Sequence, residues 1–319
     1  SLAFSINAGF PETAYLNSLL VFAWFVFSAF EMRKDTKKLK KYIVQVFISG
    51  ALGIILSLPA IYLFVHYLQN GAHIGLHDGS LHNMGVKNGT LPMFIFPYIY
   101  GLIFQNSEIT YKLWGQLGGF IGLATIILAC FGTFSSKIKL KLRIFFALTA
   151  LIAMMRIAGV PIITHIVDIL PLMGTAAVFR YLPPVLILSI IILACFGLEH
   201  FLQEKPLKKV QKLNYLSVAI MSTIVTGGLI ISRIFIENNF KNKSGIEKYY
   251  LFYLLISIAL ISLASWMAFS KKNRKKIVII FTLIALVETL GSFLLPQLAA
   301  PIRSKARVDT SAVEFLKEK

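Results

Sequence analysis

Residues 42–67 read YIVQVFISGALGIILSLPAIYLFVHY, a run of 26 residues that holds no aspartate, glutamate, lysine or arginine. About 20 apolar residues in a helix are enough to cross the hydrocarbon core of a bilayer, which is about 30 Å thick. The nine residues before this run, RKDTKKLKK at 33–41, carry six basic side chains. The stretch therefore predicts a transmembrane helix with a strongly basic end.

The composition of the 319-residue chain extends this prediction to the whole protein. Hydrophobic residues make up 57% and charged residues 14%, and the mean hydropathy is +0.75. Soluble domains carry about 25% charged residues, so the composition excludes soluble enzymes, disordered chains and coiled coils. The two cysteines, Cys130 and Cys195, both lie in apolar runs, which excludes a disulfide framework.

We predict an all-α, polytopic membrane protein with about eight transmembrane helices. The predicted spans are 14–30, 42–67, 115–134, 144–160, 183–202, 213–236, 250–270 and 277–295. They form a transmembrane core segment over residues 1–295. Residues 296–319 turn polar and are predicted to begin an extracytoplasmic soluble domain. Because the chain starts at Ser1 and stops in a charged stretch, we expect it to be an internal fragment of a longer protein.

The net charge of +18 would suggest nucleic-acid binding on a soluble protein. Here 19 of the 32 basic residues lie in four short loops that alternate along the chain, after the first, third, fifth and seventh spans. The positive-inside rule places such loops in the cytoplasm. We therefore expect membrane lipids as partners, no nucleic acid, and both ends of the chain on the extracytoplasmic side.

Two apolar segments between spans are too short or too broken to cross comfortably. Residues 91–105 hold Pro92 and Pro97, and residues 161–182 are interrupted by prolines, a glycine and Asp168. Irregular backbone at membrane depth must be enclosed by protein or lie at the interface. We expect both segments to be interfacial or re-entrant on the outer side.

The outer side also carries several ionisable residues that are candidates for binding or catalysis. Glu12 opens the first span, where it either faces an outer cavity or stabilises a helix N-terminus. The glycine-rich loop before 91–105 holds His73, His77, Asp78 and His82. Three interpretations of these histidines are open: they are solvated, they contact a phosphate or sugar hydroxyl, or they bind zinc. Of these, we do not predict the zinc site.

Two arginines are better suited to bind an anion. Arg156 lies at the outer end of the fourth span and Arg180 just before the fifth. A guanidinium binds phosphate through two parallel hydrogen bonds, although snorkelling to lipid headgroups is the simpler explanation for an exposed arginine. Asp168 either forms a structural ion pair with one of these arginines or acts as a catalytic acid. Glu288, inside the eighth span, would pair with Arg233 or another residue, or belong to a proton pathway.

The order of several short motifs resembles the YfhO-type bacterial membrane proteins, which are similar to polyprenyl-phosphate-dependent glycosyltransferases of the GT-C architecture. The motifs are GFPETAY at 9–15, LSLP at 56–59, PYIYG at 97–101, AVFRYLP at 177–183, FGLE at 196–199 and VEFLK at 313–317. One departure is that Pro184 and Val185 stand where that family often has a second arginine, so Arg156 would have to replace it.

The resemblance implies transfer of a sugar from a polyprenyl-phosphate donor to a cell-surface glycan, lipid or polymer at the outer face of a bacterial cytoplasmic membrane. Arg180, Arg156, Glu12, His77, His82 and Asp168 would line the substrate site. The catalytic acid of such enzymes lies in an earlier outer loop, so no catalytic residue is assigned here. No cofactor is expected, although a divalent metal is compatible. A transporter or flippase for a lipid-linked or anionic solute and a non-catalytic membrane scaffold are the alternatives.

Overall fold

The computed structural model describes residues 2–8, 11–70, 85–102, 108–170, 177–203, 208–240, 244–269 and 274–299, which are almost entirely helical and include no β-strand. The elements are α1 (Leu2–Asn7), α2 (Pro11–Met32), α3 (Thr36–Asn70), the 3-10 helix η2 (Asn88–Phe94), α4 (Glu108–Leu117), α5 (Leu123–Thr133), α6 (Leu140–Ile157), α7 (Pro161–Asp168), α8 (Val178–Tyr181), α9 (Pro183–Gln203), α10 (Lys208–Asn239), α11 (Ser244–Phe269) and α12 (Arg274–Ala299). The predicted all-α class is confirmed.

Five helical segments are long and apolar enough to cross a membrane. They are Glu12–Met32, Thr36–Tyr67, Val178–Leu202, Gln211–Asn239 and Gly245–Phe269. The bent pair α6 and α7 makes a sixth if it is taken as one span, and α5 and Val278–Leu294 are shorter apolar helices. The chain thus has the helices of a multi-pass membrane protein, and the count of eight spans stays a prediction.

The predicted span 115–134 is wrong in its first part. α4 ends at Leu117, residues 118–122 are not helical, and only Leu123–Thr133 form α5. Gly118, Gly119 and Gly122 have φ angles of 59°, 147° and 88°, a region that residues with a Cβ avoid. These glycines break the helix, and apolar composition alone did not reveal the break.

The last described helix passes the boundary predicted at residue 295, and the division into two domains stays a prediction. α12 continues to Ala299 without interruption. Residues 300–319, which include most of the predicted start of a soluble domain, lie outside the described residues.

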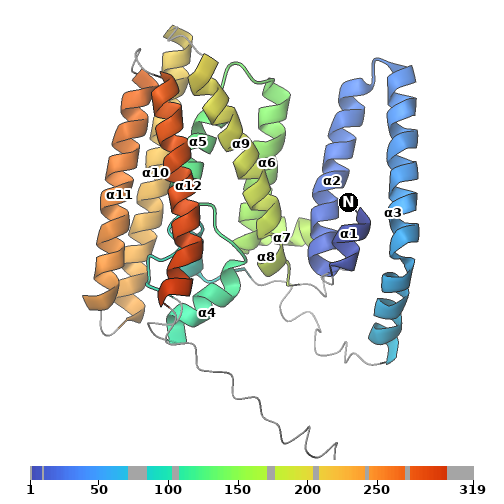
Figure 1. The fold of residues 1–319 in the computed structure, drawn as a ribbon, viewed down its shortest axis with the longest axis horizontal. Coiled ribbons are helices and arrows are strands. Elements are labelled where there is room, and N and C mark those ends of the chain that lie inside the picture. The colour runs from blue at the N-terminus through green and yellow to red at the C-terminus, as the bar shows by residue number, and fades with distance from the viewer. Residues whose placement is uncertain are drawn as a thin grey trace, which may run out of the picture.

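The four basic loops join helix ends that lie together at one end of the bundle. Figure 1 shows the junctions α2/α3, α5/α6, α9/α10 and α11/α12 at its top, an end that we call the basic end. The N-terminus of α2 lies toward the opposite end, together with α4, α7 and α8. This grouping is what the positive-inside rule requires, and the cytoplasmic location of the basic end remains a prediction.

The core of the bundle is the crossing of α5 and α9. A Cβ added to Gly132 would lie 1.8 Å from the carbonyl oxygen of Leu193, and one added to Gly197 would lie 2.0 Å from that of Leu128. The two helices therefore touch backbone to backbone, as small residues permit in membrane bundles. The other neighbours of α5 are the helices α6, α10, α11 and α12.

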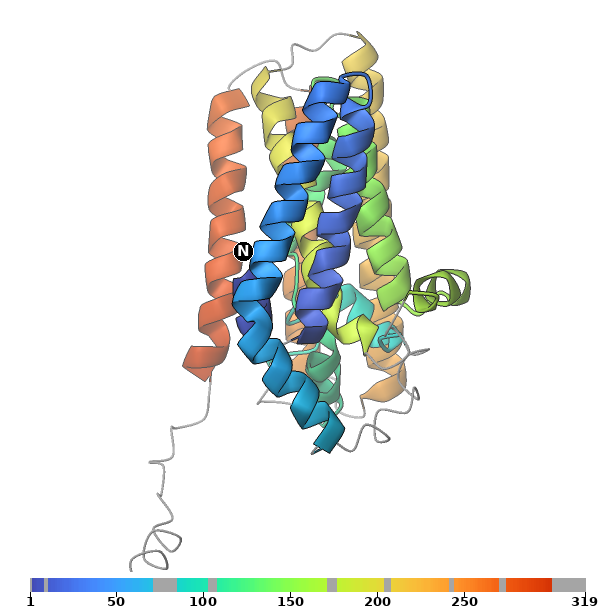
Figure 2. The same ribbon diagram turned by 90° about the vertical axis from the view of Figure 1, so that its right-hand side faces the viewer.

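The hairpin α2–α3 stands to one side of this core (Figures 1 and 2). α2 contacts α8 and α9, and its Trp24 stacks on Phe146 of α6 with ring centroids 5.8 Å apart. α3 packs mainly on α1 and α2. Most of its large apolar side chains are exposed, as expected of a helix that faces lipid.

The described part of the segment 91–105 is not a regular transmembrane helix, and its re-entrant or interfacial character stays a prediction. η2 and the turns that follow are buried, with Phe94 1% exposed and Phe96 and Tyr100 fully enclosed. Their neighbours are α10 and α4. The non-helical backbone is thus covered by protein, as irregular backbone must be if it lies at membrane depth.

Candidate functional site

Four of the predicted site residues lie at the end opposite the basic end. Glu12 begins α2, Arg156 ends α6, Asp168 ends α7 and Arg180 lies in α8. Between α6 and α7 the chain turns at a glycine and a proline: Gly159 has a φ of 73° and Pro161 starts α7.

α7 leaves α6 at an angle of 101° and projects from the side of the bundle in Figure 2. Its exposed side chains include Ile162, Ile166 and Ile169, at 73%, 56% and 75% exposure. Spacing of about four residues places these isoleucines on one helix face. An apolar face on a helix that runs across the bundle axis is typical of an interfacial membrane helix, as predicted for 161–182.

Arg156 and Asp168 form an ion pair across this bend. Arg156 Nη2 lies 3.4 Å from Asp168 Oδ1, and the side chains are 0% and 14% exposed. The predicted pairing of Asp168 with an arginine is confirmed. Because the guanidinium of Arg156 is enclosed and pairs with Asp168, it joins the end of α6 to the end of α7 and is not open to the surface.

Arg180 is exposed and belongs to the four-residue helix α8. Its guanidinium carbon lies 5.9 Å from the centre of the Tyr181 ring, and among the described residues it has no ion-pair partner. Its backbone is held closely: a Cβ on Gly118 would lie 2.5 Å from the carbonyl oxygen of Arg180. The glycine break between α4 and α5 therefore helps to fix the position of this cation.

Glu12 lies in the first turn of α2, partly exposed, where a carboxylate is favoured by the helix dipole. One turn later, Leu16 forms a small apolar cluster with Val178 of α8. The helices that carry Glu12 and Arg180 are thus neighbours, and an acid and an exposed cation stand on adjoining elements.

The predicted histidine residues cannot be placed in this site. His77 and His82, together with His73 and Asp78, belong to 71–84 and lie outside the described residues. Within the part of the chain that is described, no group of three or more His, Cys, Asp or Glu side chains is arranged to hold a metal ion.

Glu288 occupies an interior position that its sequence context did not reveal. Its carboxylate accepts hydrogen bonds from the backbone N–H of Leu123 at 2.6 Å and of Ala124 at 3.0 Å. These are the first two residues of α5, whose N-terminal N–H groups have no partner within the helix. A Cβ on Gly122 would lie 2.9 Å from this carboxyl carbon, so the glycine gives the carboxylate room.

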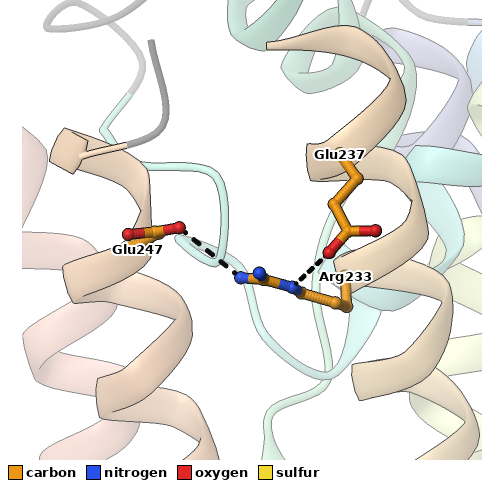
Figure 3. A network of polar contacts seen from close by, with 3 residues as sticks. All are labelled: Arg233, Glu237 and Glu247. Atoms are coloured by element: carbon orange, nitrogen blue, oxygen red, sulfur yellow. Dashed lines mark hydrogen bonds and ion pairs between the residues drawn. The ribbon is translucent and has the colours of Figure 1, made fainter. Parts of the chain in front are cut away.

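The proposed pairing of Glu288 with Arg233 is wrong. Figure 3 shows Arg233 between Glu237 of the same helix and Glu247 of α11. Arg233 Nε donates to Glu237 Oε1 at 2.8 Å, and Nη1 lies 3.7 Å from Glu247 Oε1. All three side chains are 42–49% exposed, so this network joins α10 to α11 near the surface.

The opposite end of α5 is held by a residue that the sequence analysis counted only as a topology signal. Arg143 Nη1 donates to the carbonyl oxygen of Thr133 at 2.8 Å, and Nε donates to that of Ile138 at 3.1 Å. α5 thus has a carboxylate at its N-terminus and a guanidinium at its C-terminus, each complementary to the helix dipole. Glu288 and Arg143 are charged residues in apolar surroundings, and this was the only signal that the sequence offered for them. Nothing in the sequence linked either residue to α5.

Comparisons of the chain with protein-family models, with curated proteins and with solved structures found no match.

Proposed function

We propose that this protein is a membrane glycosyltransferase that takes its sugar from a polyprenyl-phosphate donor at the end of the bundle opposite the basic end. Arg180 binds the phosphate of the donor. α7, with its exposed isoleucines, lies in the membrane interface beside it, where the lipid chain of the donor arrives. The transferred sugar goes to a surface glycan, lipid or polymer.

The observation that carries this proposal is the exposed guanidinium of Arg180, which has no ion-pair partner among the described residues. Departure of a lipid phosphate leaves negative charge on its oxygens, and a positioned cation stabilises that charge in the transition state. Arg180 is supported from both sides, by the glycine break at Gly118 and by α9, which begins three residues later. The resemblance of AVFRYLP at 177–183 to the corresponding turn of GT-C-like proteins supports the same assignment.

The other residues have supporting roles in the proposed site. The Arg156–Asp168 pair holds α7 at its angle and so positions the interface at which the donor arrives. Glu12, on the neighbouring α2, lines the same end. The carboxylate that would deprotonate the acceptor hydroxyl is not assigned, because Glu12 is the first-turn acid of α2 and has no observed contact with Arg180.

Replacing Arg180 tests the proposal directly. In the full-length protein, Arg180→Ala should lower sugar transfer from a polyprenyl-phosphate donor about a hundredfold or more. Arg180→Lys should retain part of the activity, because it keeps the charge and loses the bidentate geometry. Lys248→Gln, an exposed cation on α11, is the matched control. Normal transfer by a well-expressed Arg180→Ala protein would refute the phosphate role.

A transporter or flippase is the second candidate, and the discontinuity before α5 favours it. Transporters commonly bind solutes or ions at helices that are broken inside the membrane, and Glu288 lies at such a break. This candidate predicts that Glu288→Gln abolishes proton-driven uptake of a lipid-linked or anionic solute into proteoliposomes. Covalent sugar transfer that survives Glu288→Gln, with no solute movement in either protein, would exclude it.

A further inference from the structure

Residues 118–122 form the non-helical link between α4 and α5, and this link is closely packed. The backbone N–H groups of Ile121 and Gly122 both donate to the carbonyl oxygen of Phe94, at 2.7 and 3.2 Å. Phe94 belongs to the buried helix η2. A Cβ on Gly119 would lie 2.7 Å from a side-chain atom of α9. Closely packed backbone of this kind transmits a displacement to its neighbours, because it has no free space to absorb it.

One end of the link touches the backbone of Arg180. A Cβ on Gly118 would lie 2.5 Å from the carbonyl oxygen of Arg180 and 2.9 Å from Cγ of Pro183. In a continuous helix this carbonyl oxygen would accept a hydrogen bond from the N–H of residue 183 or 184, but both are prolines, which have no N–H. The carbonyl group of Arg180 is therefore not bonded into α9, and its packing against Gly118 helps to fix its position.

The other end of the link meets Glu288. The carboxyl carbon of Glu288 lies 2.9 Å from the position of a Cβ on Gly122, and its two oxygens accept the N–H groups of Leu123 and Ala124. A buried N–H that loses its acceptor costs free energy, which a shift of the chain toward a new acceptor relieves. Because α5 itself touches α9 backbone to backbone, the link is the part of the chain that would shift.

We propose that Glu288 is a positioning residue for the phosphate site. It holds the start of α5, and through the link at 118–122 it sets the position of Arg180. The inference rests on the function proposed above, which assigns Arg180 to the phosphate of the donor. Glu288 acts here without touching the donor, whereas in a transporter it would take part in moving the solute.

A double-mutant cycle tests this role. The probe is undecaprenyl phosphate, titrated into the purified full-length protein in detergent and followed by native mass spectrometry. Glu288→Gln should weaken binding about fivefold or more by displacing Arg180, and Arg180→Ala should also weaken it. Adding Glu288→Gln to Arg180→Ala should have no further effect, because an effect that acts through Arg180 disappears with it. Undecaprenol, which lacks the phosphate, should bind equally to every member of the cycle.

Gly118→Ala tests the same path at its other end. The added methyl group must displace the carbonyl oxygen of Arg180, so this variant should also weaken the binding of undecaprenyl phosphate and not that of undecaprenol. Gly115→Ala in α4 and Gly291→Ala in α12 are the matched controls, because a Cβ at either position meets nothing within 4 Å. Both controls should bind undecaprenyl phosphate as the wild type does.

The outcomes separate this inference from the proposed function. Unchanged binding by Arg180→Ala would refute the phosphate site and the positioning role with it. Weaker binding by Arg180→Ala, together with unchanged binding by Glu288→Gln, would overturn the positioning role alone. So would a loss from Glu288→Gln that is equally large in the Arg180→Ala protein, or a loss that extends to undecaprenol, since a general structural defect would produce both.

Discussion

α3 and α5 are opposite ways of placing an apolar helix in a membrane protein. α3 has 35 residues, packs mainly on α1 and α2, and exposes most of its large apolar side chains. α5 has 11 residues, nine of them buried, and at about 1.5 Å per residue it is far shorter than the membrane core. A long apolar helix needs only lipid around it. A short one needs neighbours that cover its sides and satisfy both of its ends.

The largest difference between the two helices should appear when a methyl group is added. Gly132→Ala would force a Cβ to within 1.8 Å of the carbonyl oxygen of Leu193, so α5 and α9 must separate. We expect a cost of about 3 kcal/mol or more, seen as a lower thermal midpoint in detergent. Gly197→Ala should act alike.

The matched control lies in α3. A Cβ on Gly50 meets nothing within 4 Å, and alanine is the better helix former by about 1 kcal/mol. Gly50→Ala should leave the midpoint unchanged or raise it. Equal midpoints for Gly132→Ala and Gly50→Ala would show that the close crossing of α5 and α9 does not exist.

The next largest effect concerns the N-terminus of α5. Glu288→Ala leaves the buried N–H groups of Leu123 and Ala124 without an acceptor, which costs about 1–3 kcal/mol for each group. Glu288→Gln keeps one acceptor oxygen and should cost clearly less. Thermal midpoints of the two variants provide the comparison, and a Gln variant as unstable as the Ala variant would contradict the capping role.

A smaller loss is expected at the other end of α5. Arg143→Ala removes the donors to Thr133 and Ile138, but both residues are partly exposed and water can replace the guanidinium. We expect about 1 kcal/mol, again from the thermal midpoint. Lys139→Ala, an exposed neighbour, is the control; if it destabilises as much as Arg143→Ala, the effect reflects net charge and not the contact with α5.

The smallest effect belongs to the start of α3. Asp35 Oδ1 accepts a hydrogen bond from the backbone N–H of Lys38 at 3.1 Å, and this bond, followed by the Lys38 ammonium, lowers the pKa of Asp35. A carboxyl group with a lowered pKa stabilises the folded state above its ordinary pKa of about 4. That contribution disappears as the pH falls through the lowered value.

Asp35→Ala should therefore have a slightly lower thermal midpoint than the wild type at pH 7, and the difference should vanish at low pH. Whether the difference in thermal midpoint shrinks or grows as the pH falls decides the test. A difference that grows on acidification would mean that Asp35 does not cap α3 through its ionised form.

Local composition predicted the helices but not how they end. Apolar runs located α2, α3, α9, α10 and α11, and basic loops identified the end at which they meet. The break at Gly118–Gly122 was missed because an apolar window does not distinguish glycine in a helix from glycine with a positive φ. The partner of Glu288 was missed because it is a pair of backbone N–H groups about 165 residues away in sequence.

The candidate site was predicted only in part, because the sequence shows contacts within one bend but not how separate helices pack. Asp168 and Arg156 are 12 residues apart and share one bend, so their pairing was within reach of the sequence. That Arg156 would be enclosed and Arg180 exposed depends on how α7 and α8 pack against α2 and α6. No local pattern encodes that packing.

The brace between Arg156 and Asp168 makes α6 and α7 a rigid elbow, with one arm along the bundle and the other across it. A change in bilayer thickness that tilts the first arm must swing the second through the headgroup region. Because α8 packs against α6, a tilt of the first arm would also shift Arg180 relative to the lipid headgroups.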